Sequence, residues 1–284
     1  MNYRHAFHAG NFADVLKHAV LAQCLAALNH KETAYRVIDT HAGPGLYDLA
    51  GDKAQRTGEA ADGVARLAGD HEAPLAELLA PYLAALAEAR TRYGETIYPG
   101  SPAIARLMMR PQDRAIFCEK HPEDALALER YTRNDPRVKV LTIDGWTALK
   151  ANLPPKERRG LVVIDPPYEA ADEIEKLPGF ITTAWRKWQT GQFVIWYPIK
   201  DLRRIDAFYA AMTNSGIKKV LRAELAVDNP TRAEGLVATG LLVINPPWTL
   251  ESMLKQGLPL LLKMLQRKDD GFWRCDWLIP EERD

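Results

Sequence analysis

The sequence predicts an α/β fold with a mainly parallel sheet, and two observations lead to this expectation. Short β-branched or apolar runs alternate with helical stretches over most of the 284 residues, which is the pattern of repeated β–α–β units. Several of these runs end in turns that contain Gly, Pro or an acid, and in open α/β sheets ligands bind outside the carboxyl ends of the strands. A chain of this length can hold one large domain, or one domain with a substantial insertion.

The strands are expected in chain order, beginning with the run that precedes a His-Ala-Gly-Pro-Gly turn. Five runs are expected to form the first strands: Tyr35–Asp39, Ala115–Glu119, Val138–Ile143, Leu161–Asp165 and Phe193–Tyr197. Two longer, more alternating runs, Lys218–Val227 and Leu236–Ile244, are joined by Asp228–Gly235 and are expected to form an antiparallel hairpin that closes the sheet. A helix over Thr249–Gln266 and a last strand over Phe272–Ile279 are expected to follow.

An amphipathic helix is expected ahead of the first strand, over Ala13–Leu28. Asn11 and Asp14 are both suitable N-cap residues, because their side-chain oxygens can accept from the unpaired N–H groups of the first turn. The sequence leaves this choice open.

The segment between the first two expected strands is too long for a simple crossover. It is rich in Ala, Leu and Glu and has few β-formers, and a structureless loop of that length is uncommon in a compact domain. We therefore predict a small helical insertion over residues 46–97, placed on one edge of a main domain that comprises residues 1–45 and 98–284.

The strongest candidate for chemistry is Asp165-Pro166-Pro167-Tyr168, directly after an expected strand. An aryl amine is a poor nucleophile because its lone pair is delocalised into the ring. The Asp165 carboxylate and the Pro166 carbonyl can accept both amino hydrogens and favour the pyramidal nitrogen that attacks a methyl group. Tyr168 offers a flat face to a base that has left its stack. The pattern favours methyl transfer to an exocyclic amine over a plain strand-ending turn.

A second tetrapeptide of the same kind, Asn245-Pro246-Pro247-Trp248, also follows an apolar run. Only one of the two can hold the reacting amine. Asp165 follows the strand expected next to the first one, whereas Asn245 would end a hairpin strand nearer the edge of the sheet. We therefore assign catalysis to Asp165 and interpret the second tetrapeptide as a structural turn that helps to wall the pocket.

A cofactor site is expected at the ends of the first three strands. Gly43 and Gly45 lie in the turn after the first strand, where glycine lets the backbone approach a ligand; the turn lacks the GxGxxG pattern, which disfavours a dinucleotide. Glu119 ends the second strand, where a carboxylate can accept both ribose hydroxyls. Asp144 and Gly145 follow the third, where the carboxylate can accept from an adenine amino group. A helix N-cap or a surface charge is the alternative for either acid.

Composition limits the possible partners. Lys+Arg and Asp+Glu each number 37, so the chain lacks the overall basic charge of many nucleic-acid binders. Local basic groups such as Lys200, Arg203 and Arg204 are more typical of solvated faces. No apolar run approaches the ~20 residues of a membrane span, and the N-terminus lacks the apolar region of a signal peptide.

Cysteine and histidine usage gives no sign of a metal site. Cys24, Cys118 and Cys275 are far apart in sequence and form no CxxC pair, so a disulfide framework is not expected and a reducing cytoplasm is the expected location. The histidines show no HxxxH or Cys/His spacing, so we expect no metal.

The chain resembles the amino-methyltransferases that carry a (D/N/S)PP(Y/F/W) motif, and more closely the RlmJ family of large-subunit ribosomal RNA adenine-N6 methyltransferases. The segments that carry the resemblance are NYRHAFHAGNFADVLKH at the start, DTHAGPG, YPGSP, the Glu of CEKHP, DGW, RRGLVVIDPPYE, WYP and VINPPW. They cover nearly the whole chain. The resemblance implies a Rossmann-like class I methyltransferase sheet with a helical insertion after the first strand and no separate recognition domain.

The resemblance also implies a cofactor, a substrate and a set of site residues. S-adenosylmethionine would donate a methyl group to N6 of an adenine in 23S ribosomal RNA, and we expect a monomer. The implied cofactor and catalytic residues are His18, His41, Ser101, Glu119, Asp144, Gly145 and Asp165. The RNA-facing residues are Tyr3, His5 and Lys17. His18 would fold over the methionine end of the cofactor, and Tyr3, Arg4 and His5 would form an arm near the pocket mouth.

Three other activities remain open at this point. DNA adenine methylation uses the same constellation, although a site-specific DNA enzyme usually carries a recognition domain. A non-catalytic RNA-binding or ribosome-assembly factor could retain the same fold. Methylation of a protein glutamine is a weaker alternative.

Overall fold

The computed structural model describes residues 8–51, 54, 58–170, 172–233, 235–268 and 270–281, and the structural statements that follow concern these residues. Their eight-stranded sheet has the order β10-β8-β9-β7-β6-β1-β4-β5. The strands are β1 (Arg36–Asp39), β4 (Arg114–Cys118), β5 (Val138–Leu141), β6 (Gly160–Ile164), β7 (Gln192–Pro198), β8 (Val220–Ala226), β9 (Ala238–Ile244) and β10 (Phe272–Ile279). The first five are parallel to one another, which confirms the predicted α/β class.

The last three strands run antiparallel to their neighbours. β8 and β9 pair as the predicted hairpin, but this hairpin does not close the sheet. β9 lies inside it, beside β7, and β10 returns to pair with β8 and forms the edge. The expectation that the hairpin closes the sheet was therefore wrong, because the C-terminal strand adds one more antiparallel pair outside it.

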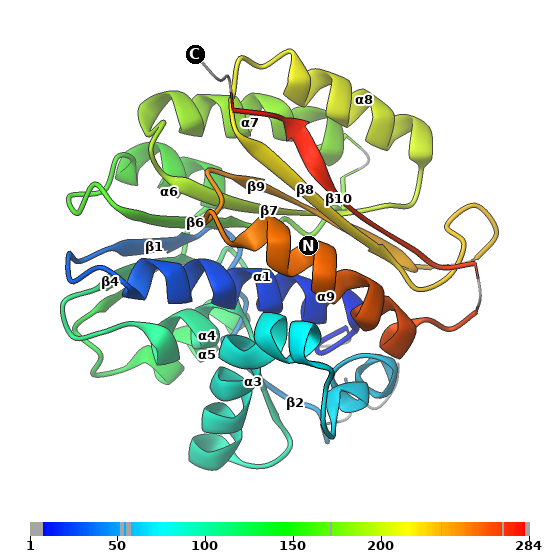
Figure 1. The fold of residues 1–284 in the computed structure, drawn as a ribbon. Helices are drawn as coiled ribbons and strands as arrows, with labels where there is room; N and C mark the ends of the chain where they lie inside the picture. The colour runs from blue at the N-terminus through cyan, green and yellow to red at the C-terminus, as the bar shows by residue number, and fades with distance from the viewer. Residues whose placement is uncertain are drawn as a thin grey trace.

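Side chains that alternate along the strands form an apolar cluster on each face of the sheet. Val37 and Val163 belong to the cluster beneath α1 (Phe12–Asn29), α3 (Ala73–Tyr93) and α9 (Leu250–Leu265). Ile38 and Ile164 belong to the opposite cluster, which is covered by α6 (Gly145–Asn152), α7 (Glu173–Lys187) and α8 (Leu202–Thr213). The remaining α-helices are α4 (Ser101–Met108) and α5 (Pro122–Thr132). The result is three layers with the sheet in the middle (Figure 1).

α1 begins where the sequence suggested. Asn11 is its N-cap, and the Asn11 side chain accepts from the Asp14 N–H over 3.0 Å. This settles the choice between the two candidate caps and leaves the Asp14 carboxylate for other contacts. α1 is buried on nearly all sides, because it lies between the sheet and the segment that follows β1.

That segment is largely helical, as predicted. It contains η2 (Glu59–Asp62), η3 (Val64–Leu67), α3 and the unpredicted two-stranded sheet of β2 (Leu46–Asp48) and β3 (Ile97–Pro99). Leu78 and Tyr82 of α3 belong to the same apolar cluster as Leu16 and Leu21 of α1. The apolar stripe of α3 is buried against α1 and α9 (Figure 1), so the segment forms an outer part of that helical layer.

No helix in the described part of the chain is long and apolar enough to cross a membrane.

Candidate active site

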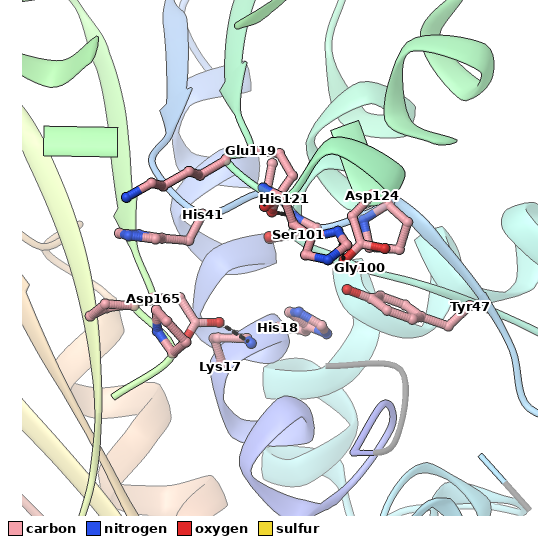
Figure 2. Close-up of a pocket in the computed structure, with 16 residues that line it drawn as sticks. Lys17, His18, His41, Tyr47, Gly100, Ser101, Glu119, His121, Asp124 and Asp165 are labelled. Carbon is pink, nitrogen blue, oxygen red and sulfur yellow. Dashed lines mark hydrogen bonds and ion pairs between the residues drawn. The ribbon is translucent and has the colours of Figure 1, made fainter. Parts of the chain in front are cut away.

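Adjacent strands bring three acids to one edge of the sheet. β1 lies between β4 and β6, so Asp39, Glu119 and Asp165 all stand at or just beyond carboxyl ends of neighbouring parallel strands. A cavity of about 730 Å³ opens there (Figure 2). Its walls are Lys17, His18, His41, Ala42, Gly43, Pro44, Tyr47, Gly100, Ser101, Glu119, Lys120, His121, Asp124, Asp165, Pro166 and Pro167.

The glycine turn after β1 is tied to the acid after β4. Gly43 has φ +63°, and its N–H donates to Glu119 Oε2 over 2.8 Å. A Cβ on Gly43 would lie 2.4 Å from the Tyr47 hydroxyl, so this position needs glycine for both its conformation and its space. Gly45 also has positive φ, but it does not line the cavity. Its carbonyl accepts from the N–H of Gly100, which does, over 2.9 Å.

Glu119 is nearly buried at the back of this cavity. Its Oε1 accepts from the His121 N–H over 2.7 Å, so both carboxylate oxygens are held by the backbone. Burial raises the pKa of Glu119 above its usual range, although the two N–H donors oppose the shift. A fixed carboxylate of this kind is suited to accept from hydroxyl groups of a ligand.

Asp39 lies deeper and supports the wall from below. Ser101 Oγ donates to Asp39 Oδ2 over 2.7 Å, and the His41 N–H donates to Oδ1 over 3.2 Å. Asp39 is 1% exposed, and burial raises its pKa to about 7, while the Ser101 and His41 donors oppose the rise. Ser101 therefore reaches the cavity from a position fixed by a buried acid.

The two predicted histidines line the same cavity. His18 on α1 is buried, and its Nδ1 lies 2.7 Å from the Tyr98 hydroxyl. Burial lowers the pKa of His41 to about 4, so the His41 ring is neutral at pH 7. The His41 ring contacts the edge of Trp146 with ring centres 5.6 Å apart, which holds it over the end of β1.

Asp165 stands where this cavity meets a second one. The second cavity, of about 990 Å³, is lined by His8, Asn11, Ala13, Asp14, Lys17, Glu59, Asp165, Pro167, Tyr168, Glu169, Trp196, Pro198, Lys200, Gly235 and Leu236. Asp165, Lys17 and Pro167 line both cavities. Tyr168 lines the second, where its hydroxyl donates to the Trp196 carbonyl over 2.6 Å. A group held by Asp165 can therefore face occupants of both cavities.

Lys17 is buried, and its contact with RNA remains a prediction. It is 4% exposed. Its Nζ lies 2.6 Å from Asp165 Oδ2 (Figure 2) and 2.8 Å from Asp14 Oδ1. Burial alone would lower the pKa of Lys17, but the two carboxylates raise it well above its usual range. The other two RNA-facing candidates, Tyr3 and His5, lie outside the described residues.

The acid after β5 does not line either cavity. Asp144 Oδ2 accepts from the Thr147 N–H over 2.9 Å and caps α6, which is the N-cap alternative left open for it. Gly145 is required for packing, because a Cβ there would lie 2.1 Å from the Thr40 carbonyl. A cofactor contact by Asp144 remains a prediction.

Asn245 and Asp165 lie at opposite ends of the strands of the sheet. β9 runs antiparallel to β7, and Ile244 pairs with Phe193 near the start of β7. The Asn245 Nδ2 donates to the Gln189 and Gly191 carbonyls over 2.7 and 2.8 Å. The interpretation as a structural turn agrees with this geometry, but the expectation that it helps to wall the pocket was wrong, because the strand runs the other way.

Sequence reasoning missed several side chains that build the site. Asp14 was considered only as a cap, although it stands three residues before Lys17, a spacing that places both on one face of a helix. Glu59, from the insertion, binds His8 Nδ1 over 2.8 Å and accepts from Asn11 Nδ2 over 3.0 Å at the second cavity. No local signal pointed to Glu59. Within the part of the chain that the structure describes, no group of three or more His, Cys, Asp or Glu could hold a metal ion.

Comparison with known proteins places the chain in a family. Residues 32–279 match the model of the family described as ribosomal RNA large subunit methyltransferase D, RlmJ. The chain is 40% identical to the ribosomal RNA large subunit methyltransferase J of Haemophilus influenzae, over 99% of this chain and 100% of that protein. It is also 40% identical to the protein of the same name from Escherichia coli, with the same coverage.

A solved structure agrees with this result. The crystal structure of protein LPL1258 from Legionella pneumophila has a TM-score of 0.83 with this chain at 33% sequence identity, and the match covers 95% of this chain and 98% of that one. The family model and the two relatives extend over nearly the entire sequence. This chain therefore belongs to the RlmJ family of ribosomal RNA large-subunit methyltransferases.

Proposed function

We propose that this protein transfers a methyl group from S-adenosylmethionine to the exocyclic N6 of an adenine in 23S ribosomal RNA. Family membership supports the substrate and the reaction. The observation that carries the chemistry is the position of Asp165, which lines both of two adjoining cavities. One cavity can hold the methyl donor and the other the acceptor base, with Asp165 between them.

The first cavity fits S-adenosylmethionine. The fixed Glu119 carboxylate is suited to the ribose hydroxyls, the Gly43 turn permits close approach of the ligand, and His18 and Ser101 are polar wall residues for the amino-acid end. When bound, the cofactor supplies an electrophilic methyl group.

The second cavity fits an adenine that has left its stack. We assign the target amino group to Asp165 and the Pro166 carbonyl, because together they can accept both of its hydrogens. Lys17 holds Asp165 Oδ2, so Oδ1 is the oxygen assigned to the amine. Tyr168, fixed through its hydroxyl to the Trp196 carbonyl, provides a ring against which the base can pack.

The role assigned to these residues is mainly alignment. A carboxylate and a carbonyl that are already held in place orient the amine without reorganisation, and such fixed dipoles account for much of the acceleration in many enzymes. Lys17 keeps the Asp165 carboxylate in one orientation and balances its charge. Tyr3 and His5 are proposed to approach the RNA from the N-terminal arm, and Asp144 to reach the adenine of the cofactor.

The setting of the reaction is proposed in the same way. Cys24, Cys118 and Cys275 are buried and free, which suits a reducing cytoplasm. We propose that the protein acts there as a monomer, and that residues 46–97 are a subdomain of a single methyltransferase domain.

Methyl transfer from labelled S-adenosylmethionine to ribosomal RNA that lacks the modification is the direct test. Nucleoside analysis of the product should show N6-methyladenosine with the native protein and none with Asp165→Ala. Asn245→Ala is the matched control, because it alters the other Pro-Pro tetrapeptide at the far edge of the sheet. Cofactor binding without transfer to RNA, together with transfer to duplex DNA or protein, would contradict the proposal. Absence of cofactor binding would favour a non-catalytic RNA-binding factor.

A further inference from the structure

A third cavity adjoins the one assigned to the target adenine. Its volume is about 520 Å³, and its walls are Tyr168, Ala170, Ile174, Pro198, Lys200, Asp201, Arg204 and Ile205. Tyr168, Pro198 and Lys200 line both this cavity and the second one. The two spaces therefore share a wall that includes the tyrosine of the Asp-Pro-Pro-Tyr turn.

The charges on the two cavities differ in a way that matters for RNA. The second cavity carries four carboxylates, from Asp14, Glu59, Asp165 and Glu169, against the ammonium groups of Lys17 and Lys200 and the imidazole of His8, which is paired with Glu59. Lys17 is already matched by two of these acids. Such a lining accepts from an amino group but repels a phosphate. The phosphates that flank a target adenine must therefore leave this cavity.

The third cavity has the opposite balance. Lys200 and Arg204 face one acid, Asp201, and that acid has a structural task. Its carboxylate accepts from the Arg203 and Arg204 N–H groups over 3.0 and 3.4 Å and caps α8. Lys200 stands at the boundary of the two cavities. It is exposed and can meet a phosphate there.

The remaining walls of the third cavity are suited to a base or a ribose. Ala170, Ile174, Pro198 and Ile205 make one side apolar. Arg204 contacts Glu175 at 3.4 Å and Asp201 at 4.0 Å, with all three side chains about half exposed. Surface ion pairs of this kind contribute little, so a phosphate can compete with these acids at small cost.

We propose that this third cavity binds the nucleotide next to the target adenine in the RNA strand, with Lys200 and Arg204 contacting the phosphates that join or follow the two nucleotides. The inference rests on the proposed function, since it takes the second cavity as the adenine site. It adds a determinant of substrate choice, because the target adenine would lie on one side of Tyr168 and the adjacent nucleotide on the other.

Two variants test the charge and the space separately. Arg204→Gln removes one charge from the cavity, and Arg203→Gln is the matched control, because it removes the same charge one residue away on α8, outside the cavity lining. Ala170→Phe fills the cavity and leaves its charges unchanged. For each protein, kcat and KM are measured with unmodified ribosomal RNA as a function of salt, and the dissociation constants of S-adenosylmethionine and of adenosine monophosphate are measured in parallel.

The proposal predicts a specific pattern of results. Arg204→Gln and Ala170→Phe should each raise KM for RNA several-fold, with kcat, cofactor affinity and affinity for adenosine monophosphate unchanged. Each phosphate contact on a single strand contributes about 0.7 to the salt slope. The rise in KM between about 50 and 200 mM salt should therefore be roughly 2.6-fold smaller for Arg204→Gln than for the native protein or Arg203→Gln.

Other results would overturn the inference without touching the proposed function. An unchanged KM in both variants would show that the cavity does not contact RNA. Equal losses of affinity for adenosine monophosphate and RNA would assign the cavity to the target nucleotide itself. Equal effects of Arg203→Gln and Arg204→Gln on KM would show that RNA binding depends on the general charge of this surface and not on the third cavity. If the native protein did not methylate RNA at all, the proposed function would fail first.

Discussion

Lys17 Nζ lies 2.6 Å from Asp165 Oδ2, and both groups stand between the two cavities assigned to methyl donor and acceptor. The two residues are 148 positions apart in the chain. The ammonium is also held by Asp14 at 2.8 Å, so one buried cation serves two carboxylates. This arrangement sets the orientation of the Asp165 carboxylate before any substrate arrives, and it underlies the first two predictions.

Lys17→Met should destabilise the fold and slow the reaction together. Removing the cation leaves Asp14 and Asp165 without their shared partner in a buried place, and breaking a buried ion pair typically costs about 3–5 kcal/mol. The unfolding temperature and kcat should both fall. Lys255→Met, which breaks an exposed pair with Glu251, is the control and should cost less than about 1 kcal/mol. An unchanged unfolding temperature in Lys17→Met would refute the structural role given to this lysine.

Asp165→Asn should reduce turnover with little change in cofactor affinity. The amide keeps the shape of the side chain but is a weaker acceptor for the target amine, and loss of one fixed polar contact to a reacting group commonly reduces kcat by about 10²–10³-fold. Lys17 retains Asp14 as a partner, so the protein should remain folded. Asp206→Asn, on the exposed side of α8, is the control. Retained kcat would show that another group holds the amine.

Glu119→Gln should weaken S-adenosylmethionine binding by about 10–100-fold, as expected when a charged acceptor for hydroxyl groups is lost. The amide can keep one of the two backbone N–H contacts but presents an N–H group in place of the other oxygen. Isothermal titration with the cofactor measures the effect. Glu123→Gln, an exposed acid at the start of α5, should bind the cofactor like the native protein, and an equal loss there would contradict the assignment of Glu119.

Asp39 should give the protein a pH-dependent stability. Its pKa is raised to about 7 in the fold by burial, against about 3.9 in an unfolded chain. Between these values the folded state holds a proton that the unfolded state releases. Stability from this group is therefore greatest below the unfolded pKa and falls, by up to about 1.4 kcal/mol per pH unit, as pH rises towards 7.

Asp39→Asn should remove this contribution. The amide can accept from the His41 N–H and donate to the Ser101 hydroxyl, so both contacts survive in altered form. The native protein should lose stability relative to Asp39→Asn between pH 4 and 7, and the difference should level off above pH 8. Chemical unfolding at a series of pH values measures it. A constant difference across this range would mean that Asp39 ionises normally in the fold.

Asn245→Ala should cost stability and spare activity. The side chain donates to the Gln189 and Gly191 carbonyls, and the residue has φ +51°, a conformation that asparagine tolerates better than alanine. We expect a loss of about 2 kcal/mol in the free energy of unfolding and a kcat within two-fold of the native value. A kcat loss comparable to that of Asp165→Ala would reverse the assignment of the two Pro-Pro tetrapeptides.

Local sequence patterns were enough to predict the strands of the eight-stranded sheet and the ends of these strands at which ligands bind, but not the small sheet of β2 and β3. The turn at Gly43, the acid Glu119 and the Asp165 tetrapeptide each follow an apolar run, and carboxyl ends of neighbouring parallel strands meet at one edge. Because strand formation and turn chemistry depend on residues close in sequence, these features could be recognised without a structure. The family resemblance added His18 and Ser101, which line the first cavity.

Only the tertiary structure decided which residues meet across long distances and which face each element presents. The direction of β9 placed Asn245 away from the pocket, the apolar stripe of α3 was buried over α1, and β10 became the edge strand. Lys17 proved to be a buried partner of Asp165 because helix packing brought the two together. Such contacts form when the whole chain packs, so they cannot be predicted from any short stretch of sequence.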